Sequence, residues 1–148
     1  MAIKIKKETN RLKGFNVASG VTLVAGMVVT KDATDSTGET IKLSDGTTAN
    51  YPLGLSLETN VVFSDGAKYY DDYAKGGKVG STWGPAIVEL YDDGRGSPYV
   101  TTDTYNINDP VYCDGNGRIT STPGGKIQIG WVDKTPENDG ILGVRIII

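Results

Sequence analysis

The chain has 148 residues, a net charge of −3, one cysteine and no histidine. A chain of this length suits one domain with a core large enough to fold without disulfides, and a lone cysteine allows no disulfide within the chain. The lack of histidine excludes Ser-His-Asp and Cys-His catalysis and any histidine-ligated metal site.

A basic segment opens the chain. Residues 1–13 carry five Lys or Arg against one Glu, a net charge of +4, so the remaining 135 residues carry −7. Isoleucine and lysine alternate over residues 3–6, a pattern typical of a short strand. We therefore expect residues 1–14 to form an extended basic N-terminal arm ahead of an acidic body at 15–148.

The start of the chain does not have the pattern of a signal peptide, because its lysines are not followed by an apolar run of seven or more residues. No apolar stretch is long enough to cross a membrane. We therefore expect a protein that is made in a cytoplasm and has no membrane partner.

Short apolar segments follow the arm and predict β-strands. Residues 21–29 are apolar nearly throughout and predict a buried strand pair or a bulged strand. Alternation of apolar and polar residues predicts half-buried strands at 53–58, 85–91, 126–132 and 141–148. The tyrosine-rich stretch 67–78 is the one place where a short helix or turn competes.

The alternation also predicts which side chains share a face. Val88 and Leu90 lie opposite Ile87 and Glu89, and a second strand groups Ile127, Ile129 and Trp131. The last strand groups Leu142, Val144, Ile146 and Ile148, and it must be covered by its own sheet or by a neighbour. Val144, Ile146 and Ile148 are therefore candidate subunit contacts.

Turn signals separate these segments about every ten residues, a spacing typical of all-β sandwiches and barrels. Glycine makes up 20 of 148 residues, roughly twice the usual share of about 7%. The sequence predicts an all-β chain, a single β-barrel or β-sandwich-like domain with short hairpins. Five Asp-Gly pairs are turn candidates: Asp45-Gly46, Asp65-Gly66, Asp93-Gly94, Asp114-Gly115 and Asp139-Gly140.

The run CDGNGR at 113–118 resembles the opening of a calcium loop. Asp114 and Asn116 could supply oxygen ligands, but Arg118 and Gly125 occupy the positions where the loop needs an oxygen ligand and a bidentate Glu. Gly, Asn and Asp tolerate positive φ, so the run predicts a tight turn between two short strands and no metal site.

Few residues are suited to catalysis. Cys113 alternates with apolar neighbours and is predicted to be a small buried thiol rather than a nucleophile. Glu89 with Asp93, or Asp71 with Asp72, could form a glycosidase-like pair, yet adjacent aspartates in a strand point to opposite faces. No phosphate-binding glycine motif occurs. We expect no enzyme activity and no cofactor.

An aromatic cluster offers a binding alternative. Tyr69, Tyr70, Tyr73 and Trp83 could form a stacking platform for sugars, or they could close one end of a barrel or lie in a subunit contact. Nucleic acid is not an expected partner, because the acidic body repels phosphates and the cations of the arm lack interleaved aromatic residues.

Strand-and-turn phrases over most of residues 15–148 resemble a known family. They are VTLVAGMVVT, YPLGLSLET, YYDDYAKGGKVG, GPAIVELYDDG, NDPVYCDGNGRIT, KIQIGWV and LGVRIII. Together they are similar to the small capsid decoration, or cement, proteins of tailed bacteriophages.

The resemblance implies a structural role without catalytic residues. It implies a β-barrel or β-sandwich body that assembles as homotrimers on the outer capsid surface of the virion and stabilises the capsid. It also implies an arm that reaches over the major capsid protein. The arm contacts would be Ile3, Lys4, Ile5, Lys6, Lys7, Arg11 and Lys13. A glycan-binding module and a tail-tube or baseplate subunit remain alternatives.

Overall fold

The computed structural model describes residues 3–8, 11–56, 60–62, 68–70, 78–83 and 86–148. These residues form thirteen strands and no helix, so the all-β prediction is confirmed. Within them there is accordingly no helix that could span a membrane. The strands are β1 (Ile3–Glu8), β2 (Arg11–Val17), β3 (Val28–Lys31), β4 (Thr40–Leu43), β5 (Gly54–Ser56), β6 (Asn60–Val62), β7 (Lys68–Tyr70), β8 (Lys78–Trp83), β9 (Ala86–Leu90), β10 (Pro110–Cys113), β11 (Ile119–Thr120), β12 (Gln128–Lys134) and β13 (Leu142–Ile146).

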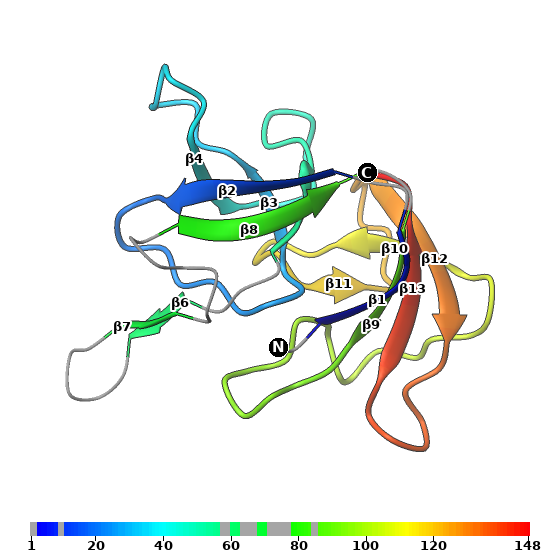
Figure 1. Cartoon of the computed structure of the whole chain (residues 1–148). Coiled ribbons are helices and arrows are strands. Elements are labelled where there is room, and N and C mark those ends of the chain that lie inside the picture. The colour runs from blue at the N-terminus through cyan, green and yellow to red at the C-terminus, as the bar shows by residue number, and fades with distance from the viewer. Residues whose placement is uncertain (1–2, 9–10, 57–59, 63–67, 71–77, 84–85) are drawn as a thin grey trace.

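Two curled sheets make up the body (Figure 1). One is a six-stranded antiparallel sheet in the order β1-β9-β13-β12-β10-β11. The other closes into a barrel in the order β2-β4-β3-β5-β8, in which only β2 and β4 run parallel. Strands β6 and β7 form a separate antiparallel pair. Of the stretch 67–78, residues 68–70 and 78 are in strands, and residues 67 and 71–77 lie outside the described residues.

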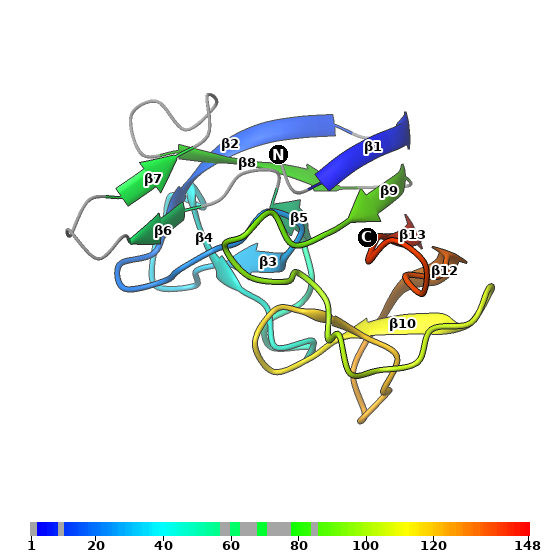
Figure 2. The same ribbon diagram turned by 90° about the horizontal axis from the view of Figure 1, so that it is seen from below.

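One long two-stranded ribbon runs through both sheets (Figure 2). Strand β1 pairs with β9 in the six-stranded sheet, and β2 pairs with β8 in the barrel. The pairing keeps one register where the ribbon passes from one sheet to the other. Glu8 pairs with Ala86 in the six-stranded sheet, and Arg11 pairs with Trp83 in the barrel. Each half of the ribbon therefore belongs to a different sheet.

This pairing changes the interpretation of the N-terminal arm. Residues 3–8 and 11–14 are extended, but their backbones pair with strands of the body. The expected boundary between residues 14 and 15 falls inside β2. A basic segment next to unpaired strand edges gains backbone hydrogen bonds by joining them, and the sequence of the segment alone does not reveal those edges.

The core follows the alternation of the strands. In β9 the side chains of Ala86, Val88 and Leu90 are buried and those between them are half-buried, as predicted. The six-stranded sheet and the inner end of the barrel share one cluster, which includes Val28, Leu55, Val88, Tyr105, Val111, Ile129, Leu142 and Val144. A smaller cluster inside the barrel consists of Phe15, Leu23, Val29 and Ile41.

The predicted face of β12 is wrong beyond Ile129. Val111 pairs with Gly130 but Tyr112 pairs with Gln128, so Ile129 is an extra residue, a β-bulge. Because a bulge shifts the alternation by one residue, Ile129 and Val132 are both buried whereas Trp131 is 36% exposed.

The proposed subunit contact on β13 needs a correction. This strand lies between β9 and β12, not at an edge of the sheet. Val144 and Ile146 are buried in the core of the chain itself, and Ile148 packs partly buried against that core. The apolar C-terminal strand is covered by its own sheet, so Val144 and Ile146 do not lie at the surface.

Candidate functional site

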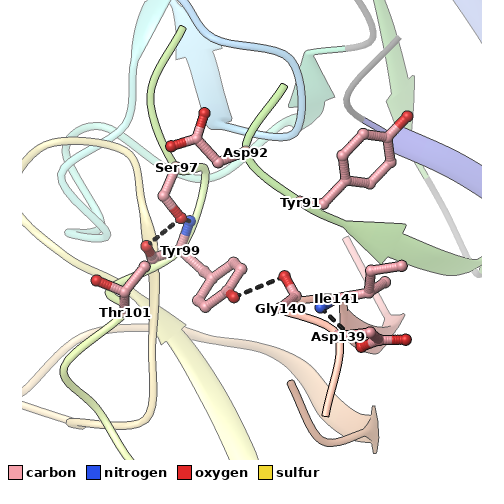
Figure 3. Close-up of a pocket in the computed structure, with 8 residues that line it drawn as sticks. All are labelled: Tyr91, Asp92, Ser97, Tyr99, Thr101, Asp139, Gly140 and Ile141. Carbon is pink, nitrogen blue, oxygen red and sulfur yellow. Dashed lines mark hydrogen bonds between the residues drawn. The ribbon is translucent and has the colours of Figure 1, made fainter. Parts of the chain in front are cut away.

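A pocket of about 390 Å³ opens where β9 ends, and we take it as the candidate site (Figure 3). One wall comes from the segment 91–101, which follows β9, and the other from the turn 139–141, which precedes β13. Leu90 pairs with Leu142 in the sheet, so the residues that follow one strand and precede the other meet at the same edge. Tyr91 and Ile141 are brought together in this way.

Tyr99 belongs to the first wall of the pocket and links it to the second. Its hydroxyl donates a hydrogen bond to the carbonyl of Gly140 at 2.8 Å, and its ring packs edge-to-face on Tyr105 with centroids 5.8 Å apart. The hydroxyl of Ser97 donates to the carbonyl of Tyr99 at 2.8 Å. Burial raises the pKa of Tyr99, and the charges of Asp139 and Asp92 raise it further. The phenol therefore stays neutral and rigidly held.

Two carboxylates line the pocket and also hold its loops. One oxygen of Asp92, Oδ1, accepts the backbone N–H groups of Gly94 at 2.8 Å and Gly96 at 3.1 Å. Asp139 accepts both the Lys134 ammonium, at 2.7 Å, and the backbone N–H of Ile141, at 3.0 Å. The hydrogen bond from Lys134 and that from Ile141 lower the pKa of Asp139. Asp139 therefore acts as an ionised acceptor rather than as a proton donor.

Comparison of the chain with models of protein families, with curated proteins and with solved structures found no match.

The run at 113–118 forms the predicted tight turn between β10 and β11. The Oδ1 atom of Asp114 accepts the backbone N–H groups of Asn116 at 2.8 Å and Arg118 at 2.9 Å. The Arg118 guanidinium contacts the other oxygen, with its Nη2 atom at 3.0 Å. Both carboxylate oxygens thus serve the turn. Among the described residues, no group of three or more Cys, Asp or Glu side chains is placed to hold a metal ion.

Cys113 is the small buried thiol that the sequence predicts. Its thiol donates a hydrogen bond to the Ser44 carbonyl at 3.2 Å. Burial, together with the charge of Asp114, raises the pKa of this thiol to about 12. A nucleophilic role needs a thiolate near neutral pH, which this environment disfavours.

The carboxylate pairs considered for catalysis are placed only in part. Asp93 contacts the Arg95 guanidinium at 3.3 Å, and Glu89 lies half-buried on β9. Asp71 and Asp72 lie outside the described residues, so the second pair has no structural account.

The binding residues expected from the sequence lie in several strands. The arm residues Ile3, Lys4, Ile5, Lys6 and Lys7 are in β1, and Arg11 and Lys13 are in β2. In the aromatic cluster, Tyr69 and Tyr70 are in β7 and Trp83 is in β8, whereas Tyr73 lies outside the described residues.

Sequence reasoning missed the pocket itself. It identified Asp93-Gly94 and Asp139-Gly140 as turns, and both glycines have the positive φ that such turns need. Nothing local pointed to Tyr99, because its partner Gly140 lies 41 residues further along the chain. The only available signal was the proximity of both turns to strands that pair with each other.

Proposed function

We propose that the chain is a structural virion protein that binds the outer surface of a bacteriophage capsid and stabilises it, with the major capsid protein as its partner. The resemblance of its strand-and-turn phrases to capsid decoration proteins supports this role. So does a body in which the two sheets are joined by a shared ribbon and a shared core, because a protein that clamps other subunits must itself be stiff.

The observation that carries the proposal is the position of β1 in the sheet. This strand has the sequence IKIKKE and pairs with β9 on one side, and no second strand partner for it occurs among the described residues. An edge strand can accept a further strand from a partner by backbone hydrogen bonding. A lysine-rich edge disfavours pairing with a like copy and favours an acidic partner strand. The basic strand is thus a selective edge for attachment.

Attachment is tested by adding the chain to purified capsids and measuring the bound fraction by cosedimentation, with electron micrographs to locate it. We expect binding that weakens as salt is raised, because surface charges are screened over about 8 Å at physiological ionic strength. The triple change Lys4→Gln, Lys6→Gln and Lys7→Gln should weaken binding about threefold to a hundredfold, since exposed ion pairs contribute about 0.2–1 kcal/mol each.

Lys42→Gln, which removes a cation from β4 in the barrel, is the control for a charge change outside β1 and should leave binding unaltered. Equal binding of the triple variant and the natural chain across a salt series would contradict the role of β1. Density on tails or baseplates with bare capsids would favour the tail-tube or baseplate alternative instead.

The proposal includes assembly as a homotrimer. Since Val144 and Ile146 are buried within one chain, the contact between copies must use other surfaces. Multi-angle light scattering of the free chain and of capsid-bound chain measures this directly. A monomer under both conditions would remove the trimer from the proposal and leave attachment to be judged by cosedimentation.

A further inference from the structure

We propose that the pocket between residues 91–101 and 139–141 binds one ring of a neutral saccharide. This site is distinct from the aromatic cluster of β7 and β8. Its occupancy does not depend on capsid attachment, so its failure and the failure of the proposed function are separable.

The charge of the pocket excludes an anionic ligand. Among the described residues, its lining includes the carboxylates of Asp92 and Asp139 and no Lys or Arg. Lys134 neutralises Asp139 from the side, through contacts of 2.7 and 2.8 Å to its two oxygens. One exposed carboxylate, Asp92, therefore dominates the electrostatic potential of the pocket. A ligand that donates hydrogen bonds and carries no negative charge suits this pocket best.

The hydrogen-bonding groups match the hydroxyls of a sugar. The Oδ2 atom of Asp92 and the hydroxyl of Thr101 take part in no hydrogen bond with the described residues, and both residues are exposed. Asp92 offers acceptors only, whereas a threonine hydroxyl both donates and accepts. A sugar hydroxyl uses both kinds of partner. An ammonium group has no acceptor and would leave the donor capacity of Thr101 unused.

The shape and the aromatic lining agree with a sugar ring. Tyr91 and Tyr99 come from the same wall, and Figure 3 shows Tyr91 on the side of the pocket away from Ser97 and Thr101. The lining thus combines aromatic carbon with polar groups, a composition that suits a sugar ring. A volume near 390 Å³ lies at the small end of the range of about 300–1,000 Å³ for small-molecule sites.

The test is an NMR titration of the full, ¹⁵N-labelled chain with methyl glycosides of hexoses, N-acetylhexosamines, deoxyhexoses and pentoses. We expect at least one of them to shift the amide signals of residues 91–101 and 139–141 in a saturable way that is insensitive to salt. Thr101→Val should weaken that binding about two- to tenfold, the effect of one hydrogen bond. Thr122→Val, which changes an exposed threonine outside the pocket, should bind as the natural chain does.

A second variant distinguishes a neutral from a cationic ligand. Asp92→Asn keeps an acceptor for the backbone of Gly94 and removes the charge, so saccharide binding should persist in weakened form. Choline chloride serves as the cationic probe. Choline binding that is lowered by salt, without saturable shifts from any glycoside, would overturn the proposal. Saturable shifts that Thr101→Val leaves unchanged would overturn it as well.

Discussion

Single glycines permit the close approach of the two sheets. Gly46 follows β4 and Gly117 lies in the turn between β10 and β11, and both have positive φ. The carbonyl of Gly117 accepts the backbone N–H of Val28 at 2.7 Å, and the carbonyl of Gly46 accepts that of Ile127 at 2.9 Å. These hydrogen bonds join the barrel to the six-stranded sheet. A substitution that adds a side chain at either glycine therefore changes the contact between the two sheets.

Gly117→Ala should lower the free energy of unfolding more than Gly125→Ala does. Both residues have similar positive φ, but a Cβ at Gly117 would lie 2.7 Å from Leu43 Cδ2 and 3.0 Å from the backbone oxygen of Val28, whereas a Cβ at Gly125 meets nothing within 4 Å. Backbone strain costs about 1–2 kcal/mol at either position, and overpacking adds about 1–3 kcal/mol at Gly117 alone. Urea unfolding of both variants measures the difference. Equal losses would show that the contact relaxes without cost.

A repeated Asp-x-Thr pattern braces the loops around β4. The carboxylates of Asp35 and Asp45 each accept the backbone N–H and the hydroxyl of the threonine two residues later. Hydrogen bonds from the Thr40 and Thr37 side chains lower the pKa of Asp35 to about 2. Those from Thr47 lower the pKa of Asp45 to about 2.

These shifts predict a loss of stability in acid. The folded pKa is lower than the ordinary value of 3.8, so the two carboxylates contribute stability above about pH 4. That contribution is lost as the pH falls toward 2. The double change Asp35→Asn and Asp45→Asn should lower the free energy of unfolding at pH 7 and flatten its decline between pH 4 and 2. Urea unfolding at each pH measures both effects.

Glu137→Gln is the control for the acid prediction, because Glu137 is exposed and makes no hydrogen bond within the described part of the chain. It should leave the pH profile unchanged. If the stability of the double variant declines between pH 4 and 2 as steeply as that of the natural chain, other carboxylates control the loss of stability in acid.

At the scale of elements, position within the sheet decides what each strand contributes. β13 is central and buries alternate side chains, whereas β1 is at an edge of the same sheet. The bulge at Ile129 in β12 turns Trp131 outward beside Arg145, its partner in the register. The face that a strand presents therefore depends on its partners as well as on its own pattern.

Ile146→Lys should destabilise the fold strongly, whereas Ile147→Lys should change stability by less than about 0.5 kcal/mol, as is usual for surface substitutions. Ile146 is 2% exposed and packs in the core, and its neighbour Ile147 is 48% exposed. Losing the buried side chain alone costs about 2–5 kcal/mol, and an unpaired charge adds to that cost. Thermal unfolding compares the two. A mild effect at Ile146 would contradict its burial within one chain.

At the scale of the molecule, the ribbon of β1–β2 with β8–β9 makes the two sheets interdependent. Deleting residues 2–13 would remove β1 and residues 11–13 of β2, which pair with residues 81–83 of β8 in the barrel. Such a deletion would therefore test folding rather than attachment. Charge changes within β1 are the cleaner experiment.

The two sheets should unfold in one cooperative transition. Trp83 lies in the barrel and Trp131 in the six-stranded sheet, so Trp131→Phe and Trp83→Phe each leave a fluorescent reporter for one sheet. In each variant the fluorescence midpoint in urea should coincide with the midpoint from circular dichroism, as for a two-state protein. Separate midpoints within one variant would show that the sheets unfold independently.

The sequence by itself determined the features that depend on neighbours along the chain. The alternation in β9 and β13 identified the buried faces, glycine with Asp or Asn identified turns such as that at Asp114, and apolar neighbours identified Cys113 as a buried thiol. Each of these follows from local periodicity or from the φ range that a residue tolerates, so no distant contact is needed to predict it.

Only the tertiary structure decided pairing, register and the pocket. The basic segment became strands β1 and β2 because β9 and β8 offered edges more than 60 residues away. The bulge in β12 reversed the predicted face of Trp131, and the pocket formed where segments about 40 residues apart meet at Tyr99 and Gly140. The free energy of such contacts depends on which edges remain unpaired once the other strands have formed, and local periodicity carries no record of that.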